Sequence, residues 1–207
     1  MKNLFLCSSF FDVAGILPNF LERINSNCIQ TVSFIDIASH VEEYKEYVEK
    51  AKLAFEQQSL KLEVIDFNQS SDDIVQQLQK NDLIYISGGN TFYLLQMLNE
   101  KKLTNVIVDL INYGKPYIGE SAGSVLLSEN IEYIKKMDNP QNAPNLKNYK
   151  SLNIIDFYPV PHFENQPFKN LVEQVISEYG ESLPLIAFDN KQALWVLDKT
   201  IILKDET

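Results

Sequence analysis

The chain has 207 residues, of which 45% are hydrophobic and 22% charged, and its 18 basic and 28 acidic residues give a formal net charge of −10. This length suits one domain, residues 1–207, that buries roughly 70% of the surface its unfolded chain would expose. The acidic balance argues against nucleic acid and anionic membranes as partners. No apolar run approaches the length of a membrane span or of a signal peptide, so we expect a cytoplasmic protein.

Short apolar runs alternate with amphipathic stretches over the first two thirds of the chain. The pattern predicts strands at 4–7, 31–37, 62–66, 83–86 and just before 119, and helices at 18–25, 42–58, 71–80, 91–98 and 103–113. Strands and helices that alternate with short connections are typical of a parallel, doubly wound sheet. The remaining segments are a long polar loop at 135–151, an extended segment at 157–163, a helix near 168–179, a strand at 185–190, and two runs at 193–197 and 200–203 that predict a terminal β-hairpin.

One serine lies in the pattern Gly-x-Ser-x-Gly, formed by Gly119, Ser121 and Gly123. In this pattern a sharp turn between a strand and a helix raises the serine side chain above the sheet. The positive N-terminal end of the following helix and its unpaired N–H groups favour a developing oxyanion. Ser121 is therefore a candidate nucleophile, and the alternative is a plain Gly/Ser turn that closes a strand.

A second glycine turn, Ser87-Gly88-Gly89-Asn90-Thr91, follows the run that ends at Ile86. Paired glycines allow a close backbone approach and an N–H directed at a ligand. The alternative is a capping turn in which Asn90 or Thr91 begins a helix. In an open α/β sheet this turn and the Ser121 turn both lie at carboxyl ends of strands, where ligands bind.

A nucleophilic serine needs a general base, and the chain has two histidines, His40 and His162. His40 precedes an acidic helix and is expected to cap it or to face solvent. His162 ends an extended segment and is the favoured base. The acids that could orient it are Asp138, Asp156, Glu164 and Asp189, of which Asp189 has the best placement, at the end of a predicted strand.

Three motifs together resemble the peptidase E (aspartyl dipeptidase) and cyanophycinase family of serine peptidases: residues 117–124, 88–92 and 161–163. The resemblance implies a flavodoxin-like three-layer α/β fold, related to class I glutamine amidotransferases. It implies Ser121 as nucleophile, His162 as base, and an oxyanion hole formed by the N–H groups of Gly89 and Ala122. It also implies Asp189 as the third triad member, with Asp138 as the alternative.

The sequence departs from peptidase E at two places that bear on specificity. Glu120 precedes the nucleophile where peptidase E has tryptophan, and the helix after His162 has no arginine. Glu120 and Asn90 are candidate substrate contacts, and a solvent-facing Glu120 is the alternative. We therefore expect a peptidase for small peptides in which strict Asp-X dipeptidase activity is weak or absent.

Two other functions use the same residues: an esterase or amidase, and a catalytically idle, peptide-binding member of the family. No metal or other cofactor is expected, because Cys7 and Cys28 have no metal-ligand spacing and are expected to be reduced and buried. The sequence leaves the oligomeric state open.

Overall fold

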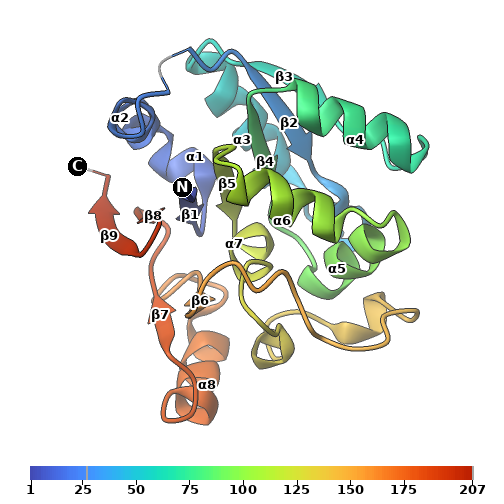
Figure 1. The fold of residues 1–207 in the computed structure, drawn as a ribbon. Coiled ribbons are helices and arrows are strands. Elements are labelled where there is room, and N and C mark those ends of the chain that lie inside the picture. The colour runs from blue at the N-terminus through green and yellow to red at the C-terminus, as the bar shows by residue number, and fades with distance from the viewer. Residues whose placement is uncertain (27, 207) are drawn as a thin grey trace.

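The computed structural model describes residues 1–26 and 28–206, and a seven-stranded sheet runs through its centre in the order β3-β2-β4-β5-β1-β8-β9 (Figure 1). Its strands are β1 (Asn3–Cys7), β2 (Thr31–Ile35), β3 (Lys61–Val64), β4 (Leu83–Ile86), β5 (Tyr117–Glu120), β8 (Gln192–Leu197) and β9 (Thr200–Asp205). The pairings among β1 to β5 are parallel, whereas β8 pairs antiparallel with β1 and with β9. The mostly parallel α/β sheet and the C-terminal hairpin predicted from the sequence are thus confirmed.

Helices cover both faces of this sheet. One face is covered by α1 (Phe10–Val13), α2 (Leu17–Arg23) and α3 (Glu46–Gln57), and the other by α4 (Ser71–Lys80), α5 (Thr91–Glu100), α6 (Thr104–Asn112) and α7 (Ala122–Val125). The remaining helix, α8 (Lys169–Tyr179), lies away from this sheet (Figure 1). Short 3₁₀ turns connect them: η1 (Ala14–Ile16), η2 (Ile37–Val41), η3 (Glu132–Ile134) and η4 (Pro140–Asn142). Among the described residues, none of these helices combines the length and the apolar character that crossing a bilayer requires.

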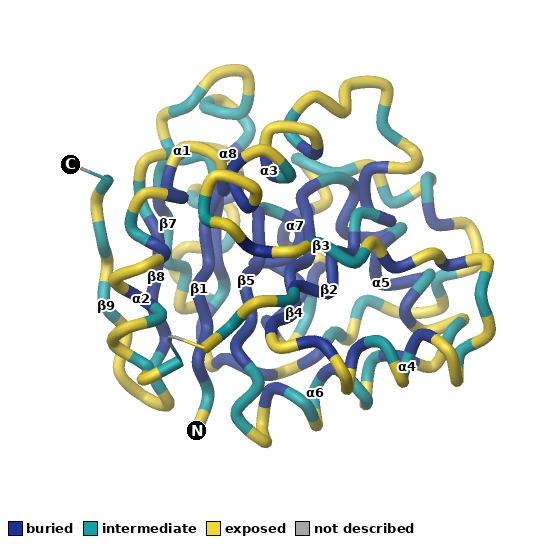
Figure 2. The backbone as a smooth tube through the Cα atoms, turned by 90° about the horizontal axis from the view of Figure 1, so that it is seen from above, coloured by how far each residue is buried: buried dark blue, intermediate teal, exposed yellow. Residues whose placement is uncertain are grey.

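The apolar strands explain this layered arrangement. Along β1, Leu4 and Leu6 belong to the hydrophobic cluster on one face, while Phe5 and Cys7 belong to the cluster on the other. Successive side chains of a strand point to opposite faces, so a strand buried on both faces is apolar at every position. The central strands are accordingly buried along their length, and the helices expose their outer sides (Figure 2).

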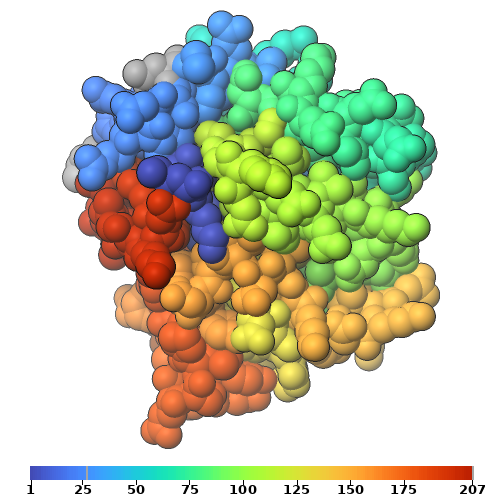
Figure 3. Space-filling model, in the orientation of Figure 1, coloured from blue at the N-terminus to red at the C-terminus, as the bar shows by residue number. Residues whose placement is uncertain are grey.

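The segment predicted to be extended before His162 is confirmed as a strand, but its place outside the main sheet and the exposure of one cysteine were not predicted. The extended segment that leads to His162 forms β6 (Tyr158–Val160), which pairs with β7 (Leu185–Ala187) in a separate two-stranded parallel sheet. In Figure 3, α8 lies in the orange part at the bottom of the surface, and the red C-terminal hairpin lies next to the dark blue N-terminal residues. Cys7 is buried as expected, but Cys28 is exposed, because the segment before β2 runs over the surface.

The two glycine-containing turns lie side by side. β4 and β5 are paired neighbours in parallel register, with Ile86 opposite Gly119. Both strands therefore deliver their following turns, residues 87–90 and 121, to the same edge of the sheet, where α/β proteins place their ligands.

Candidate active site

Ser121 occupies a strained turn between β5 and α7. Its φ of 47° and ψ of −104° lie outside the regions that L-residues favour. The Ser121 N–H donates to the Cys7 carbonyl oxygen at 2.8 Å, which ties the turn to β1. Such strain persists only where the surroundings impose it, and here it raises the side chain above the end of the sheet.

The flanking glycines are required by close backbone approaches. A Cβ at Gly119 would lie 2.6 Å from the Gly123 carbonyl carbon, and a Cβ at Gly123 would overlap the Ile86 carbonyl oxygen of β4. Real Cβ atoms essentially never approach backbone atoms this closely. The pattern therefore reflects the packing of α7 onto β4 and β5.

Substituting Gly123 by alanine is expected to lower the free energy of unfolding by about 1–3 kcal/mol, because the added methyl group meets backbone that has no room to move. Urea denaturation followed by circular dichroism measures this loss. Gly15→Ala is the matched control: its Cβ would meet only the end of the flexible Glu206 side chain, and stability should change little. Equal stabilities of the two variants would contradict the packing argument.

His162 lies within hydrogen-bond distance of Ser121, with 2.9 Å between Ser121 Oγ and His162 Nε2. The His162 backbone has a φ of 65°, and its N–H donates to Ser8 Oγ at 2.9 Å. Ser8 Oγ in turn donates to the Phe188 carbonyl oxygen at 3.1 Å. The ring of Phe168 stacks on the imidazole with centroids 4.6 Å apart, so His162 is fixed from both its backbone and its ring face.

The structure corrects the residue expected to orient this imidazole. His162 Nδ1 lies 2.8 Å from Asn190 Oδ1, and Asn190 is held by a bond from its own N–H to Asn165 Oδ1. Asp189 Oδ1 instead accepts from the Lys191 N–H at 2.7 Å, closing a turn before β8. Asn190 was missed from the sequence because only acids were considered, although it directly follows the chosen aspartate.

Asp138, the alternative orienter, also lies away from His162. Its Oδ2 accepts from the Thr91 N–H at 2.8 Å and from Thr91 Oγ1 at 2.5 Å, which fastens the 135–151 loop to the start of α5. Burial raises the pKa of Asp138 to about 6, against the lowering effect of these two bonds. The loop carboxylate thus supports the turn after β4 and does not contact the imidazole.

The bonds of His162 define its protonation state. Burial lowers the pKa of the imidazole, and the bond to Asn190 opposes this lowering. Asn190 Oδ1 accepts a hydrogen bond from the Nδ1–H group, so the neutral ring presents the lone pair of Nε2 to the Ser121 hydroxyl. This is the tautomer that a general base for serine requires.

The expected oxyanion N–H groups flank Ser121. Within the described part of the chain, neither the Gly89 N–H nor the Ala122 N–H has a hydrogen-bond acceptor. Gly89 has a φ of 127°, and a Cβ there would overlap the backbone of Ala38, so only glycine fits. The turns after β4 and β5 therefore each carry an N–H group without an acceptor, at the edge of the sheet where Ser121 lies.

The two residues expected to contact substrate face into the protein. Glu120 is 2% exposed, and its carboxylate accepts from the Phe10 N–H at 2.7 Å and from the Tyr85 hydroxyl at 2.5 Å. Burial raises the pKa of Glu120. Asn90 caps α5 by accepting from the Tyr93 N–H, and its Nδ2 donates to the Asn139 carbonyl oxygen. Both side chains therefore hold the turns in place, which corrects the expected roles.

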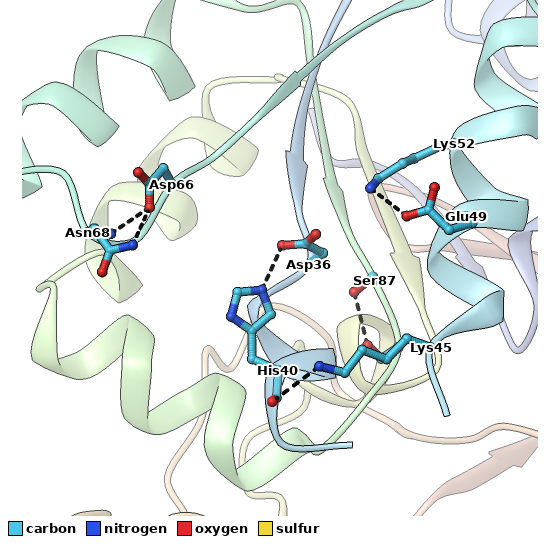
Figure 4. Close-up of polar contacts among 9 residues, drawn as sticks. Asp36, His40, Lys45, Glu49, Lys52, Asp66, Asn68 and Ser87 are labelled. Carbon is cyan, nitrogen blue, oxygen red and sulfur yellow. Dashed lines mark hydrogen bonds and ion pairs between the residues drawn. The ribbon is translucent and has the colours of Figure 1, made fainter. Parts of the chain in front are cut away.

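His40 lies in η2, after β2, and its Nε2 is 3.3 Å from Asp36 Oδ1 (Figure 4). Its side chain is 52% exposed, as predicted for a solvent-facing residue. No metal ligand cluster of three or more His, Cys, Asp or Glu residues occurs in the described ranges.

Comparisons with known proteins show what this chain is similar to. The sequence model of the family Peptidase family S51 matches residues 4–204. "Uncharacterized peptidase Lin0382" of Listeria innocua is 44% identical over 205 residues, covering 99% of this chain and 97% of its own. "Peptidase E" of Nostoc is 29% identical over 74% of this chain and 59% of its own. The crystal structure of a peptidase E-like protein from Listeria monocytogenes superposes with a TM-score of 0.92 at 44% identity, over all of both chains.

Proposed function

Because this chain belongs to peptidase family S51, we propose that it hydrolyses small peptides through an acyl-enzyme on Ser121, with His162 as the general base. The observation that carries the proposal is the 2.9 Å contact between Ser121 Oγ and His162 Nε2 at the end of β5. A proton passes from the hydroxyl to Nε2 as the oxygen attacks the substrate carbonyl, and the imidazolium then gives it to the leaving amine. Water then attacks the carbonyl of the acyl-enzyme while His162 takes a proton from it. The imidazolium returns this proton to Ser121 Oγ as the acid product leaves.

In this proposal Asn190 has the place of the triad acid. A neutral amide fixes the tautomer and the ring orientation of His162, as a carboxylate would, but it adds no negative charge to stabilise the imidazolium. The free N–H groups of Gly89 and Ala122 bind the oxyanion of the tetrahedral intermediate, and the strained Ser121 backbone keeps the nucleophile in line with them.

The experiment that tests the proposed function is intact-mass labelling of the wild-type protein with a serine-directed fluorophosphonate, followed by peptide mapping. We expect one adduct for each chain, located on Ser121, together with hydrolysis of neutral peptides. A folded protein that forms no adduct would support the idle, peptide-binding alternative. An adduct with hydrolysis of esters alone would support the esterase alternative.

Strict cleavage after an N-terminal aspartate is expected to be weak or absent. The only arginine, Arg23, lies in α2, away from the site, and a bidentate clamp for a substrate carboxylate needs arginine. Asp36, Glu42 and Asp138 add negative charge near Gly88 and Tyr47. A kinetic panel of Asp-X, neutral and basic dipeptides measures this preference, and a higher kcat/KM for Asp-X would contradict it.

A further inference from the structure

The hydroxyl of Tyr47, in the first turn of α3, is buried and has no hydrogen-bond partner among the residues that the structure describes. Buried hydroxyl groups nearly always have a partner, because an unpaired one gives up its bonds to water without compensation. Tyr44, three residues earlier, differs in this respect, since its hydroxyl donates to Glu46 Oε2 at 3.2 Å. The Tyr47 hydroxyl is therefore the one of this pair with a bonding capacity that the fold does not use.

The Tyr47 ring lies next to the catalytic serine. A Cβ built on Gly88 would be 3.6 Å from Tyr47 Cε2 and 3.3 Å from Ser121 Cβ, so the ring and the serine flank the same glycine. Gly88 belongs to the turn that carries the free Gly89 N–H. A group bound by Tyr47 would thus belong to the same molecule that Ser121 attacks.

The charges around Tyr47 are negative. Burial and the carboxylates of Glu42, Glu120, Asp138 and Asp36 together raise its pKa. Lys45, close in the sequence, donates to the His40 carbonyl oxygen (Figure 4). A negative site of this kind repels a substrate carboxylate and attracts a cation.

The aromatic ring of Tyr47 adds a second feature that suits a cation. Tyr44, whose ring centroid is 6.1 Å from that of Tyr47, is exposed to solvent. An ammonium group near the face of a tyrosine is attracted by its π electrons. The phenol oxygen of Tyr47 has lone pairs that accept from an ammonium N–H.

We propose that Tyr47 is a substrate-positioning residue that binds a protonated amino group of the peptide, through its hydroxyl and within the field of the surrounding carboxylates. This inference rests on the proposed peptidase function and names the class of substrate: peptides with an ammonium group, from either a free amino terminus or a lysine side chain.

The test measures peptide binding in a Ser121→Ala background, so that it does not depend on turnover. The probe is Lys-Ala-Ala, and isothermal titration gives its Kd for Ser121→Ala, for Ser121→Ala/Tyr47→Phe, and for the matched control Ser121→Ala/Tyr44→Phe. Loss of a hydrogen bond to a charged group is expected to raise Kd roughly 10- to 100-fold for Tyr47→Phe. The control, which loses a hydroxyl that already has a partner, should leave Kd unchanged.

Blocked peptides identify the source of the ammonium group. N-acetyl-Lys-Ala-Ala lacks the α-ammonium, norleucine-Ala-Ala lacks the side-chain ammonium, and N-acetyl-norleucine-Ala-Ala lacks both. The singly blocked peptide whose Kd still depends on Tyr47 carries the ammonium group that Tyr47 binds. The doubly blocked peptide should bind weakly to every variant. Three outcomes would each overturn the proposal. They are equal Kd values for Ser121→Ala and Ser121→Ala/Tyr47→Phe, binding of the doubly blocked peptide as tight as that of Lys-Ala-Ala, and no saturable binding of Lys-Ala-Ala.

Two further readouts distinguish a substrate-binding hydroxyl from one that serves only the fold. Tyr47→Phe should leave the thermal midpoint unchanged or raise it, and a lower midpoint with unchanged Kd would assign the hydroxyl to the fold. Hydrolysis by the wild-type protein decides the proposed function independently. If the wild-type protein cleaves peptides but Tyr47→Phe leaves the Kd for Lys-Ala-Ala unchanged, the proposed function stands and only the role of Tyr47 is contradicted.

Discussion

Replacing Ser121 by alanine is expected to lower kcat/KM for peptide hydrolysis on the order of 10⁴- to 10⁶-fold and to abolish the fluorophosphonate adduct, because no other hydroxyl in the described part of the chain hydrogen-bonds to the imidazole. Ser124, the nearest serine in the sequence, is fully buried, and its hydroxyl donates to the carbonyl oxygens of Cys7 and Gly119. Intact mass and initial-rate kinetics on the same preparations measure both effects.

The second histidine provides the control. His162→Ala should cause a loss of similar size, whereas His40→Ala, which removes an exposed ring bound to Asp36, should keep full activity. Serine and histidine act as a unit, so the double variant Ser121→Ala/His162→Ala should be no slower than either single variant. If the loss of kcat/KM in the double variant equalled the product of the two single losses, Ser121 and His162 would not act in one proton-transfer step.

Substituting Asn190 is expected to change both the rate and its pH dependence. Asn190→Ala removes the acceptor for His162 Nδ1 and frees the ring to rotate and to take the other tautomer, so kcat should fall roughly 10²- to 10⁴-fold with little change in KM. Asn190→Asp keeps an acceptor and adds a negative charge. A nearby opposite charge favours the imidazolium and raises the pKa of His162 by about 1–3 units.

The sign of the pH effect follows from the base form of His162. Only the neutral imidazole accepts the proton of Ser121, so the rate rises as pH passes upward through the His162 pKa. In the wild type, burial lowers this pKa, and the acidic limb of kcat/KM should extend to low pH. In Asn190→Asp the acidic limb should move to higher pH by the same amount as the pKa, about 1–3 units.

Asn19 is a matched control for both substitutions of Asn190. It is an exposed asparagine on α2, far from the site, so the same replacements by alanine and by aspartate can be made there. Asn19→Ala and Asn19→Asp should leave the rate and its pH profile as in the wild type. An Asn190→Asp variant with an unshifted acidic limb would show that Asn190 does not control the protonation of His162.

The sequence predicted the parts of this site that depend on local backbone chemistry. A sharp turn from a strand into a helix determines the spacing of Gly119, Ser121 and Gly123. The structure contains this turn between β5 and α7. The alternation of apolar runs likewise predicted the parallel sheet and placed the turns after β4 and β5 at one edge. Short-range patterns were enough for these features.

The partners of individual side chains depend on tertiary contacts, and the sequence did not predict them. Glu120 faces inward because Tyr85 and the Phe10 N–H satisfy its carboxylate there, and both come from distant parts of the chain. Asn190, and not Asp189, meets His162 because the turn before β8 directs Asp189 to the Lys191 N–H. A shift of one residue in a turn decides which side chain reaches the imidazole.

The position of β1 between β5 and β8 bears on the stage of folding at which the proposed site forms. Cys7 of β1 holds the Ser121 backbone, Ser8 holds the His162 backbone, and Asn190 orients the ring. These contacts join residues up to 154 positions apart, so the site forms through long loops that close late in folding. A chain that ends before residue 190 lacks the side chain that contacts His162 Nδ1, so the proposed site is complete only when nearly the whole chain is present.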